Sequence, residues 1–239
     1  MDDEIPLSPA DLTGNLPQTH GSAQGGLVAA DLARRLYRPV VLVGMMGVGK
    51  TSLGRRLAAA LGTSFVDADE EIERAAQMTI PEIFATYDEA YFRDGERRVI
   101  ARLLGLGEND GQMPQDPPHS APRVIATGGG AFCDPGTRAL ILERGIAIWL
   151  DADLDTLVER TSRKENRPLL KQGNPRDILR RLKTERQPFY AQAPIHVISG
   201  KTPHARTLSN VLDALEQWTN MAESPVARAA SPSIQDPPA

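Results

Sequence analysis

The sequence predicts an α/β fold, with a five-stranded parallel sheet and helices on both of its faces. The chain has 239 residues, 41% hydrophobic and 24% charged, which is the balance of a globular protein long enough for one α/β domain. Short apolar runs alternate with longer segments of helical spacing along most of its length. Most of these runs are apolar throughout, as is typical of strands buried on both faces of a parallel sheet.

The first half of this body is expected to hold two strands. Residues 40–43 read Val-Val-Leu-Val, a continuous apolar run that predicts a buried strand. Residues 51–61 carry leucine at every fourth position, which predicts a helix with one apolar face. Residues 64–66, Ser-Phe-Val, predict a short second strand. The spacing then predicts helices over 70–76, 80–86 and 94–104.

The second half is expected to add three strands. Apolar runs predict strands over 124–126, 146–150 and 195–198. Helical spacing predicts helices over 135–143, 154–161, 176–189 and 204–218. Because parallel strands need long crossovers, this alternation predicts one parallel sheet covered by helices.

Three segments are expected to lie outside the packed body, which we place at residues 38–218. Residues 1–37 lack sustained periodicity and are expected to be mostly disordered, with a short helix near Leu27–Leu36. Residues 105–122 hold three Gly and four Pro, which predicts a surface loop. Residues 219–239 are rich in Ala, Ser and Pro and are expected to form a disordered tail.

The net charge of −4 is unevenly distributed. The stretch 160–186 holds ten Lys or Arg against three acids, which suits an anionic ligand. Nucleic acid is the competing use of such charge. Phe189 and Tyr190 are the only aromatic residues in and beside this stretch, which argues against a base-stacking surface, so we expect no nucleic-acid partner.

Cysteine content and apolar run lengths exclude two further classes. Cys133 is the only cysteine, which excludes a disulfide scaffold. No apolar run approaches the roughly 20 residues of a membrane-spanning helix. The acidic start, Met1 to Glu4, fits neither a secretory signal nor an Arg-rich transit peptide. We therefore expect a cytoplasmic protein without a membrane partner.

Gly44–Thr51, Gly-Met-Met-Gly-Val-Gly-Lys-Thr, matches the pattern G-x-x-x-x-G-K-[ST], and we call it the phosphate loop. A Gly-rich turn with a chance lysine is the simpler explanation, but a strand precedes this segment and a helix follows it, as the motif requires. The glycines allow backbone N–H groups to surround phosphate oxygens at a helix N-terminus. Lys50 can reach the outer phosphates, and the Thr51 hydroxyl can bind Mg²⁺.

Asp67 and Asp69 come at the end of the second expected strand, in Phe-Val-Asp-Ala-Asp. Residues two apart on a strand point the same way, and ligands of open α/β sheets bind at the carboxyl edge of the strands. Asp69 could instead only cap the following helix. Beside a phosphate loop we favour a functional role, because phosphoryl transfer needs Mg²⁺ ligands and a group for the attacking hydroxyl.

Thr127 and three glycines, Gly128–Gly130, follow the third expected strand, where no acid is present. Three glycines leave backbone N–H groups open to close contact with a ligand, although a flexible turn is the simpler explanation.

Arginines provide the third group of candidates, because guanidinium groups recognise carboxylate or phosphate in a planar, bidentate way. Arg93 is expected just before a helix and Arg186 in the helix 176–189. Arg160 and Arg167 flank a segment, about 160–175, that could close over the phosphates as a lid. No role is assigned to Arg180, Arg181 and Lys183, which a solvated helix face explains equally well.

Together these elements resemble shikimate kinase. The family's order and approximate spacing are matched over about residues 38–218 by GMMGVGKTSLGRR (44–56), FVDAD (65–69), FR (92–93), TGGG (127–130), RPLL (167–170) and R-x-x-x-Y (186–190). The resemblance implies a P-loop kinase of the nucleoside monophosphate kinase type with a lid segment. It also implies transfer of the γ-phosphoryl group of ATP to the 3-hydroxyl of shikimate, in the pathway to chorismate and the aromatic amino acids.

The resemblance further implies a role for each matching residue. Lys50, Asp69 and Arg167 would be catalytic. ATP would be held by Gly44, Gly47, Val48, Gly49, Lys50, Thr51, Ser52, Arg160, Arg167 and Pro203. Shikimate would be held by Asp69, Arg93, Gly128, Gly129, Gly130 and Arg186. Mg²⁺ would be bound, directly or through water, by Thr51 and Asp67, and the enzyme is expected to be a monomer.

Asp69 would contact the ring hydroxyls, while Arg93 and Arg186 would hold the carboxylate of shikimate. With an ordinary pKa of ~3.9, Asp69 is a weak base at neutral pH, so orienting the attacking hydroxyl is its firmer role. The chain departs from the family in having Asp88-Glu89 where Gly-Glu is usual. Residues 105–122 look like an insertion, and residues 1–37 like an extension.

Three alternatives stay open. A gluconate kinase or another small-molecule kinase would share the fold, although the three glycines and the paired arginines suit a hydroxylated ring acid better. An adenylate-type kinase fits less well, because no Asp-Gly-Phe-Pro-Arg element is present. A non-catalytic nucleotide-binding regulator would be indicated by loss of Lys50, Asp69 or an arginine, and all are present.

Overall fold

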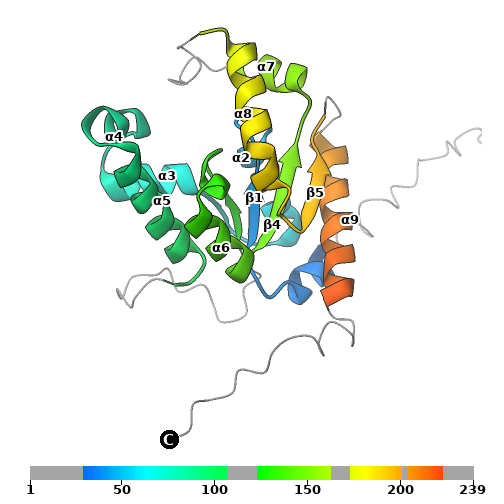
Figure 1. The fold of residues 1–239 in the computed structure, drawn as a ribbon. Coiled ribbons are helices and arrows are strands. Elements are labelled where there is room, and N and C mark those ends of the chain that lie inside the picture. Colours follow the sequence, from blue (N-terminus) through cyan, green and yellow to red (C-terminus); the bar gives the residue numbers. More distant parts are fainter. Residues whose placement is uncertain (1–28, 107–122, 163–172, 201–203, 223–239) are drawn as a thin grey trace, which may run out of the picture.

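A computed structural model of the chain describes residues 29–106, 123–162, 173–200 and 204–222. Their core is a five-stranded parallel sheet in the order β2-β3-β1-β4-β5 (Figure 1). The strands are β1 (Val40–Val43), β2 (Phe65–Asp67), β3 (Val124–Ala126), β4 (Ile146–Asp151) and β5 (Ile195–Ile198). The predicted strand number and parallel arrangement are confirmed.

The central strand β1 shows why the apolar runs fold this way. Val41 pairs with Ile125 of β3 and Ala147 of β4, and all four residues of β1 are fully buried. A strand with neighbours on both edges and helices over both faces has no polar environment, which accounts for its continuous apolar sequence.

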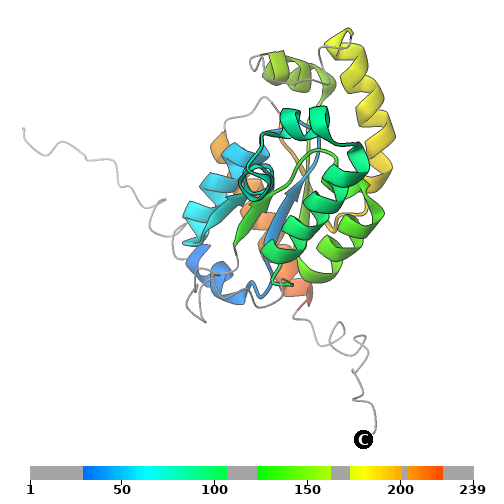
Figure 2. The ribbon, with the colours of Figure 1, turned by 90° about the vertical axis from the view of Figure 1, so that its left-hand side faces the viewer.

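Helices cover both faces of the sheet (Figure 2). They are α2 (Lys50–Leu61), α3 (Ala68–Ala76), α4 (Ile80–Thr86), α5 (Glu89–Leu103), α6 (Pro135–Arg144), α7 (Leu154–Ser162), α8 (Pro175–Tyr190) and α9 (His204–Ala222), with a 3₁₀ turn at Ala131–Cys133. Helices α2 and α9 pack together on one face, and α5 and α6 lie on the other. None of the described helices is both long and apolar enough to span a membrane.

Helix α5 begins earlier than its sequence predicted. Its N-cap is Asp88, whose side chain accepts a hydrogen bond of 2.8 Å from the N–H of Tyr91. Phe92 and Arg93, expected just before the helix, therefore lie within it. The capping carboxylate satisfies one of the orphan N–H groups of the first turn, which explains why the helix begins here.

Residues 29–35 form a helix inside the segment expected to be mostly disordered, at the place where a short helix was expected. Leu32 and Leu36 are only 2% and 4% exposed and belong to the main core. Tyr37 stacks on Trp218 of α9, with ring centroids 6.3 Å apart. Because α9 also continues past residue 218, the folded body extends at both ends beyond 38–218.

The remaining expectations for the ends, the loop and the lid concern residues that the structure does not describe. These are residues 1–28, most of the loop at 107–122, the central part of the lid at 163–172, residues 201–203 and residues 223–239.

Candidate active site

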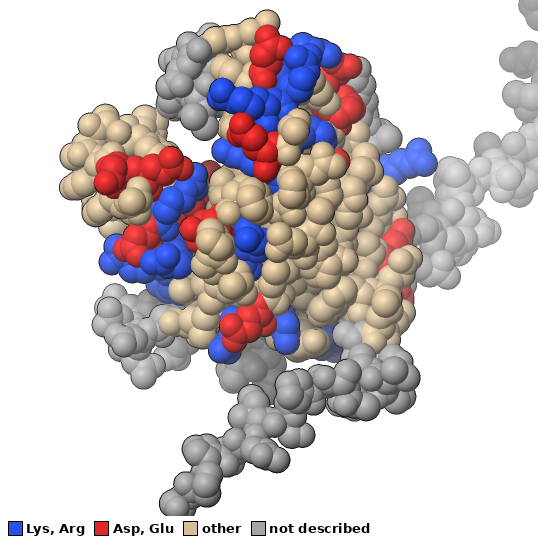
Figure 3. Space-filling view, in the orientation of Figure 1, with Lys and Arg blue, Asp and Glu red and all other residues tan. Residues whose placement is uncertain are grey.

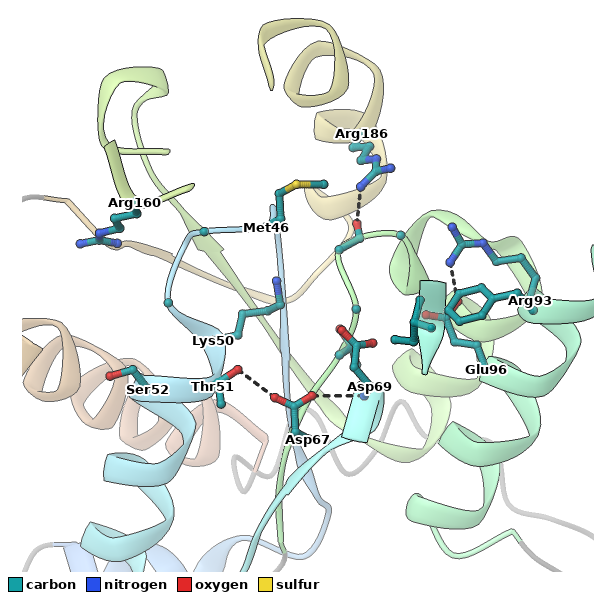
Figure 4. Close-up of a pocket in the computed structure, with 18 of the residues that line it drawn as sticks. Met46, Lys50, Thr51, Ser52, Asp67, Asp69, Arg93, Glu96, Arg160 and Arg186 are labelled. Atoms are coloured by element: carbon teal, nitrogen blue, oxygen red, sulfur yellow. Dashed lines mark hydrogen bonds and ion pairs between the residues drawn. The ribbon is translucent and has the colours of Figure 1, made fainter. Parts of the chain in front are cut away.

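A cavity of about 680 Å³ opens at the carboxyl edge of the sheet (Figure 4). It brings together the phosphate loop after β1, the two aspartates after β2, the glycines after β3, and side chains from α4, α5, α7 and α8. The residues that line it are Met46, Gly47, Gly49, Lys50, Thr51, Ser52, Asp67, Asp69, Ile80, Phe84, Phe92, Arg93, Glu96, Thr127, Gly128, Gly129, Gly130, Arg160 and Arg186.

The phosphate loop needs glycine for a steric reason at its first position. Gly44 has a φ of 132°, and a Cβ placed there would lie 2.3 Å from the carbonyl oxygen of Leu150. Lys50 folds back over the loop and donates hydrogen bonds to the carbonyl oxygens of Gly44 (2.7 Å) and Met45 (3.0 Å). Its ammonium group therefore sits where the phosphates of a nucleotide would be bound.

Asp67 and Asp69 have different contacts, and these decide which of them caps the helix that follows. The Thr51 hydroxyl donates a hydrogen bond of 2.8 Å to Asp67 Oδ2, and Asp67 Oδ1 accepts one of 3.1 Å from the N–H of Asp69. Asp67 is thus the N-cap of α3 as well as the neighbour of Thr51. The side chain of Asp69 extends toward the glycines (Figure 4) and does not cap the helix.

The pKa of Asp69 is raised from 3.8 to about 6. Burial is the main cause, and the negative charge of Asp67 adds to it, while Lys50 and Arg93 act in the opposite direction. A carboxylate that is hard to keep ionised binds a proton more strongly. The structure therefore makes Asp69 a better proton acceptor at neutral pH than the sequence led us to expect.

The glycines after β3 lie against the side chains of the cavity. A Cβ on Gly128 would come within 2.8 Å of Asp69 Oδ1, and one on Gly130 within 2.5 Å of Arg93 Nη2. A Cβ on Gly129 would lie 3.3 Å from the backbone nitrogen of Met46 in the phosphate loop. These contacts explain the three glycines by close approach of the backbone, in preference to a flexible turn.

Arg93 and Arg186 reach the same cavity from different helices. Arg93 on α5 forms an ion pair of 2.6 Å with Glu96, whose side chain is 1% exposed, and another of 3.2 Å with exposed Glu89. Arg186 on α8 donates a hydrogen bond of 2.9 Å to the carbonyl oxygen of Gly129. Both guanidinium groups are therefore held at the cavity wall (Figure 4).

Arg160 contacts the phosphate loop from α7. It donates hydrogen bonds to the carbonyl oxygens of Val48 (2.9 Å) and Gly200 (2.7 Å), so it links the loop to the segment after β5. Pro203 and Arg167, two further expected ATP ligands, lie outside the described residues.

The other described basic residues of the basic stretch are paired with acids, and Figure 3 shows acidic and basic side chains intermixed at the α7 and α8 end of the molecule. Arg180 pairs with Asp177 at 2.7 Å, and Arg176 with Asp155 at 2.6 Å. Lys183, to which no role was assigned, pairs with Asp151 at the end of β4. Arg160 and Arg186 are the two of these residues that line the cavity.

Sequence reasoning missed part of the cavity wall. Glu96 received no role from the sequence, and the apolar wall of Ile80, Phe84 and Phe92 was not foreseen. The i, i+3 spacing of Arg93 and Glu96 was the available signal. It becomes informative only when α5 is known to begin before Arg93.

Comparisons with known proteins show which proteins this chain is similar to. The family model described as shikimate kinase matches residues 46–216. The shikimate kinase of Novosphingobium aromaticivorans is 68% identical over 187 residues, which cover 78% of this chain and 92% of the relative. That of Caulobacter vibrioides is 50% identical over 191 residues, covering 80% and 88%.

Solved structures give the same result. The shikimate kinase of Acinetobacter baumannii in complex with shikimate superposes with a TM-score of 0.65 at 32% identity, covering 81% of this chain and 98% of that one. The shikimate kinase of Aquifex aeolicus has a TM-score of 0.61 at 30% identity, covering 74% and 96%. A gluconokinase from Sinorhizobium meliloti has a TM-score of 0.50 at 18% identity, covering 83% and 100%, so that likeness is one of fold.

Proposed function

The chain belongs to the shikimate kinase family, and from this membership we propose that it transfers the γ-phosphoryl group of ATP to the 3-hydroxyl of shikimate. The products are shikimate 3-phosphate and ADP, on the pathway to chorismate and the aromatic amino acids. One structural observation carries the proposal. A single cavity holds a phosphate loop, a carboxylate and two arginines, which are the groups needed to bind a nucleotide beside a hydroxylated acid.

Thr51 and Asp67 fit a magnesium ion. Their side-chain oxygens lie 2.8 Å apart next to the phosphate loop, and Mg²⁺ prefers hard oxygen ligands. Among the described residues no group of three or more His, Cys, Asp or Glu is gathered into a metal cage. Mg²⁺ bound with ATP needs no such cage, because phosphates and waters complete its shell. The ion would neutralise charge on the transferred group.

Shikimate would lie between α5, α8 and the glycines. Arg93 and Arg186 hold its carboxylate, and the backbone of Gly128–Gly130 lies close to the ring. Ile80 and Phe84 of α4 supply an apolar wall beside α5, where the rings of Phe84 and Phe92 lie 4.6 Å apart. In this pose the reacting hydroxyl would lie near Asp69.

Asp69 orients the attacking hydroxyl and accepts its proton as the bond to phosphorus forms. With a pKa of about 6, the group is mostly ionised at pH 7 and yet binds a proton far better than an ordinary aspartate. Lys50 offsets negative charge on the phosphates. In phosphoryl transfer such positioning and charge stabilisation supply most of the rate enhancement.

Two parts of the proposal rest on the family resemblance alone, because their residues lie outside those described. Arg167 contacts the transferred phosphoryl group from the lid, and Pro203 lines the adenine. We further propose, from the family resemblance, that the enzyme is a monomer, which light scattering of the purified protein tests.

The alternative functions predict different acceptors, so one assay separates them. ADP release is measured on purified protein with shikimate, with gluconate, with AMP and without an acceptor, each with ATP and Mg²⁺. The rate of ADP release with shikimate should far exceed the rates in the other three reactions, and chelation of Mg²⁺ should abolish it. A higher rate with gluconate would identify another sugar-acid kinase, and equal rates in all four would remove the shikimate assignment.

A further inference from the structure

The carbonyl oxygen of Gly129 accepts two hydrogen bonds from α8. One comes from Arg186 Nη1 at 2.9 Å, and the other comes from the hydroxyl of Tyr190, four residues later on the same helix. Arg186 has a role in the proposed function, as a ligand of the shikimate carboxylate. Tyr190 has none so far, although it ends the R-x-x-x-Y element.

The surroundings of Tyr190 keep its hydroxyl buried beside the carbonyl oxygen of Gly129. The side chain is 1% exposed, and its ring stacks on Trp149 with centroids 6.1 Å apart. The hydroxyl also lies 4.0 Å from the sulfur of Met45 in the phosphate loop. Burial raises the pKa of Tyr190, so the hydroxyl stays protonated and able to donate.

Gly129 lies between the phosphate loop and α8. A Cβ there would meet Met46 of the phosphate loop at 3.3 Å and Arg186 at 3.4 Å. A peptide unit is planar and trans, so its C=O and N–H point to opposite sides. Holding the Gly129 carbonyl toward α8 therefore also fixes the direction of the N–H of Gly130, which lines the cavity.

The two donors differ in what a bound substrate would do to them. Arg186 would share its N–H groups between the loop and the carboxylate of shikimate. Tyr190 is buried, and the other neighbours of its hydroxyl are the sulfur atoms of Met45 and Cys133, which are weak acceptors beside a carbonyl oxygen. We propose that Tyr190 is a positioning residue, whose hydroxyl holds the Gly128–Gly130 loop in its shikimate-binding form while Arg186 engages the substrate. This inference rests on the proposed function and adds a residue to it.

A similar pair of hydrogen bonds to a loop carbonyl occurs at the phosphate loop, where ATP is proposed to bind, and it serves as a control. The carbonyl oxygen of Val48 accepts hydrogen bonds from Arg160 (2.9 Å) and from the Ser199 hydroxyl (3.0 Å), and Ser199 is 6% exposed. Here too an arginine and a buried hydroxyl hold one loop carbonyl. Ser199→Ala therefore removes the same kind of bond on the ATP side.

The test compares Tyr190→Phe with Ser199→Ala in the full chain. Both KM values and kcat are measured, and shikimate binding is followed by calorimetry without nucleotide. Loss of one buried hydrogen bond corresponds to a change of about 2- to 12-fold in a dissociation constant. Tyr190→Phe should raise the KM and Kd of shikimate by such a factor and leave the KM of ATP within about twofold. Ser199→Ala should show the opposite pattern.

Each outcome has a separate meaning. Wild-type protein without shikimate-dependent ADP release would overturn the proposed function itself. An active wild type with unchanged shikimate KM and Kd in Tyr190→Phe would overturn only the role of Tyr190, as would an equal rise in both KM values. If Tyr190→Phe does not fold, hydrogen exchange of wild type decides. The amides of residues 127–133 should exchange slowly without ligand, and fast exchange would contradict the inference.

Discussion

Glu96 holds Arg93 at the wall of the cavity through an ion pair of 2.6 Å, and the side chain of Glu96 is 1% exposed. Both side chains line the cavity, but Glu96 is the more deeply buried of the two, so we expect the acid to act on substrate binding chiefly by holding the arginine. Burial raises the pKa of Glu96, and the charge of Arg93 counters this effect.

Substitution of Glu96 should therefore weaken shikimate binding and stability together. Glu96→Ala leaves Arg93 without its buried partner, and breaking a buried pair costs about 3–5 kcal/mol. The free energy of unfolding in urea should fall by that order, and the KM of shikimate should rise. Glu96→Gln, which keeps the shape and one acceptor oxygen, should lose less of both. An unchanged KM in Glu96→Ala would show that Arg93 needs no positioning.

The arginines should separate into two kinetic classes. Arg93→Ala and Arg186→Ala remove contacts to a carboxylate that takes no part in bond making, so the KM of shikimate should rise by roughly 10- to 150-fold. Arg167→Ala should instead lower kcat, because its proposed contact is to the transferred group. The check is an acceptor that lacks the carboxylate. On that acceptor the first two variants should equal wild type, and a further loss would contradict carboxylate recognition.

Lys50→Ala should lower kcat by about 100-fold or more while the protein stays folded. The lysine donates to two carbonyl oxygens of the phosphate loop, and water in the open cavity can replace it there. Lys50→Met keeps the apolar stem and should be equally inactive. Circular dichroism and kcat are measured side by side, and wild-type kcat in either variant would remove the role of Lys50.

Asp69 should make the protein less stable as pH rises. Its pKa is 3.8 unfolded and about 6 folded, so the folded state binds more protons between these values, and stability falls from about pH 4 to 6. Asp69→Asn removes this effect. Without ligands, the free energy of unfolding of the variant should exceed that of wild type by about 1–3 kcal/mol at pH 8. Near pH 3 the two values should be equal.

The same variant should lose turnover by about 10²- to 10⁴-fold, because the amide cannot accept the proton. Urea unfolding at pH 3 and pH 8 and a kcat measurement check both parts. A pH-independent difference in stability would show that the carboxylate is not penalised by burial.

Removal of residues 1–28 should leave kcat within a few-fold, because no described site residue precedes Gly44. The helix at 29–35 should behave differently. Leu32→Ala, at a side chain 2% exposed, should cost about 2–5 kcal/mol of unfolding free energy without changing kcat at low temperature. Thermal unfolding and kcat on both proteins test this, and an unaffected melting temperature in Leu32→Ala would mean that the helix does not contribute to the core.

The sequence alone located the features that are encoded by a few consecutive residues. The phosphate loop, the Asp67–Asp69 pair and the strands of continuous apolar residues each lie within a few positions, and all were located. Helix α5 was misjudged because its start depends on the Asp88 cap, and one aspartate before a polar segment is a weak signal.

The contacts of Tyr190 and Ser199 could not be foreseen for a different reason. Each donates to a backbone carbonyl oxygen, of Gly129 and Val48 respectively, and every residue has such an oxygen. Only the fold decides which carbonyl faces which hydroxyl. The raised pKa of Asp69 likewise depends on burial, which the motif does not encode.

The stack of Tyr37 on Trp218 and the hydrogen bond from Arg35 to Asn220 join the first described helix to the last. Figure 1 shows this junction at the amino edge of the sheet, whereas the cavity opens at the carboxyl edge. The two ends of the folded body are thus neighbours, remote from the chemistry. A short peptide joining residue 222 to residue 29 would close the backbone into a ring without crossing the cavity mouth. A circularly permuted chain, which presents the same elements in a different order along the sequence, should therefore be able to form the same fold.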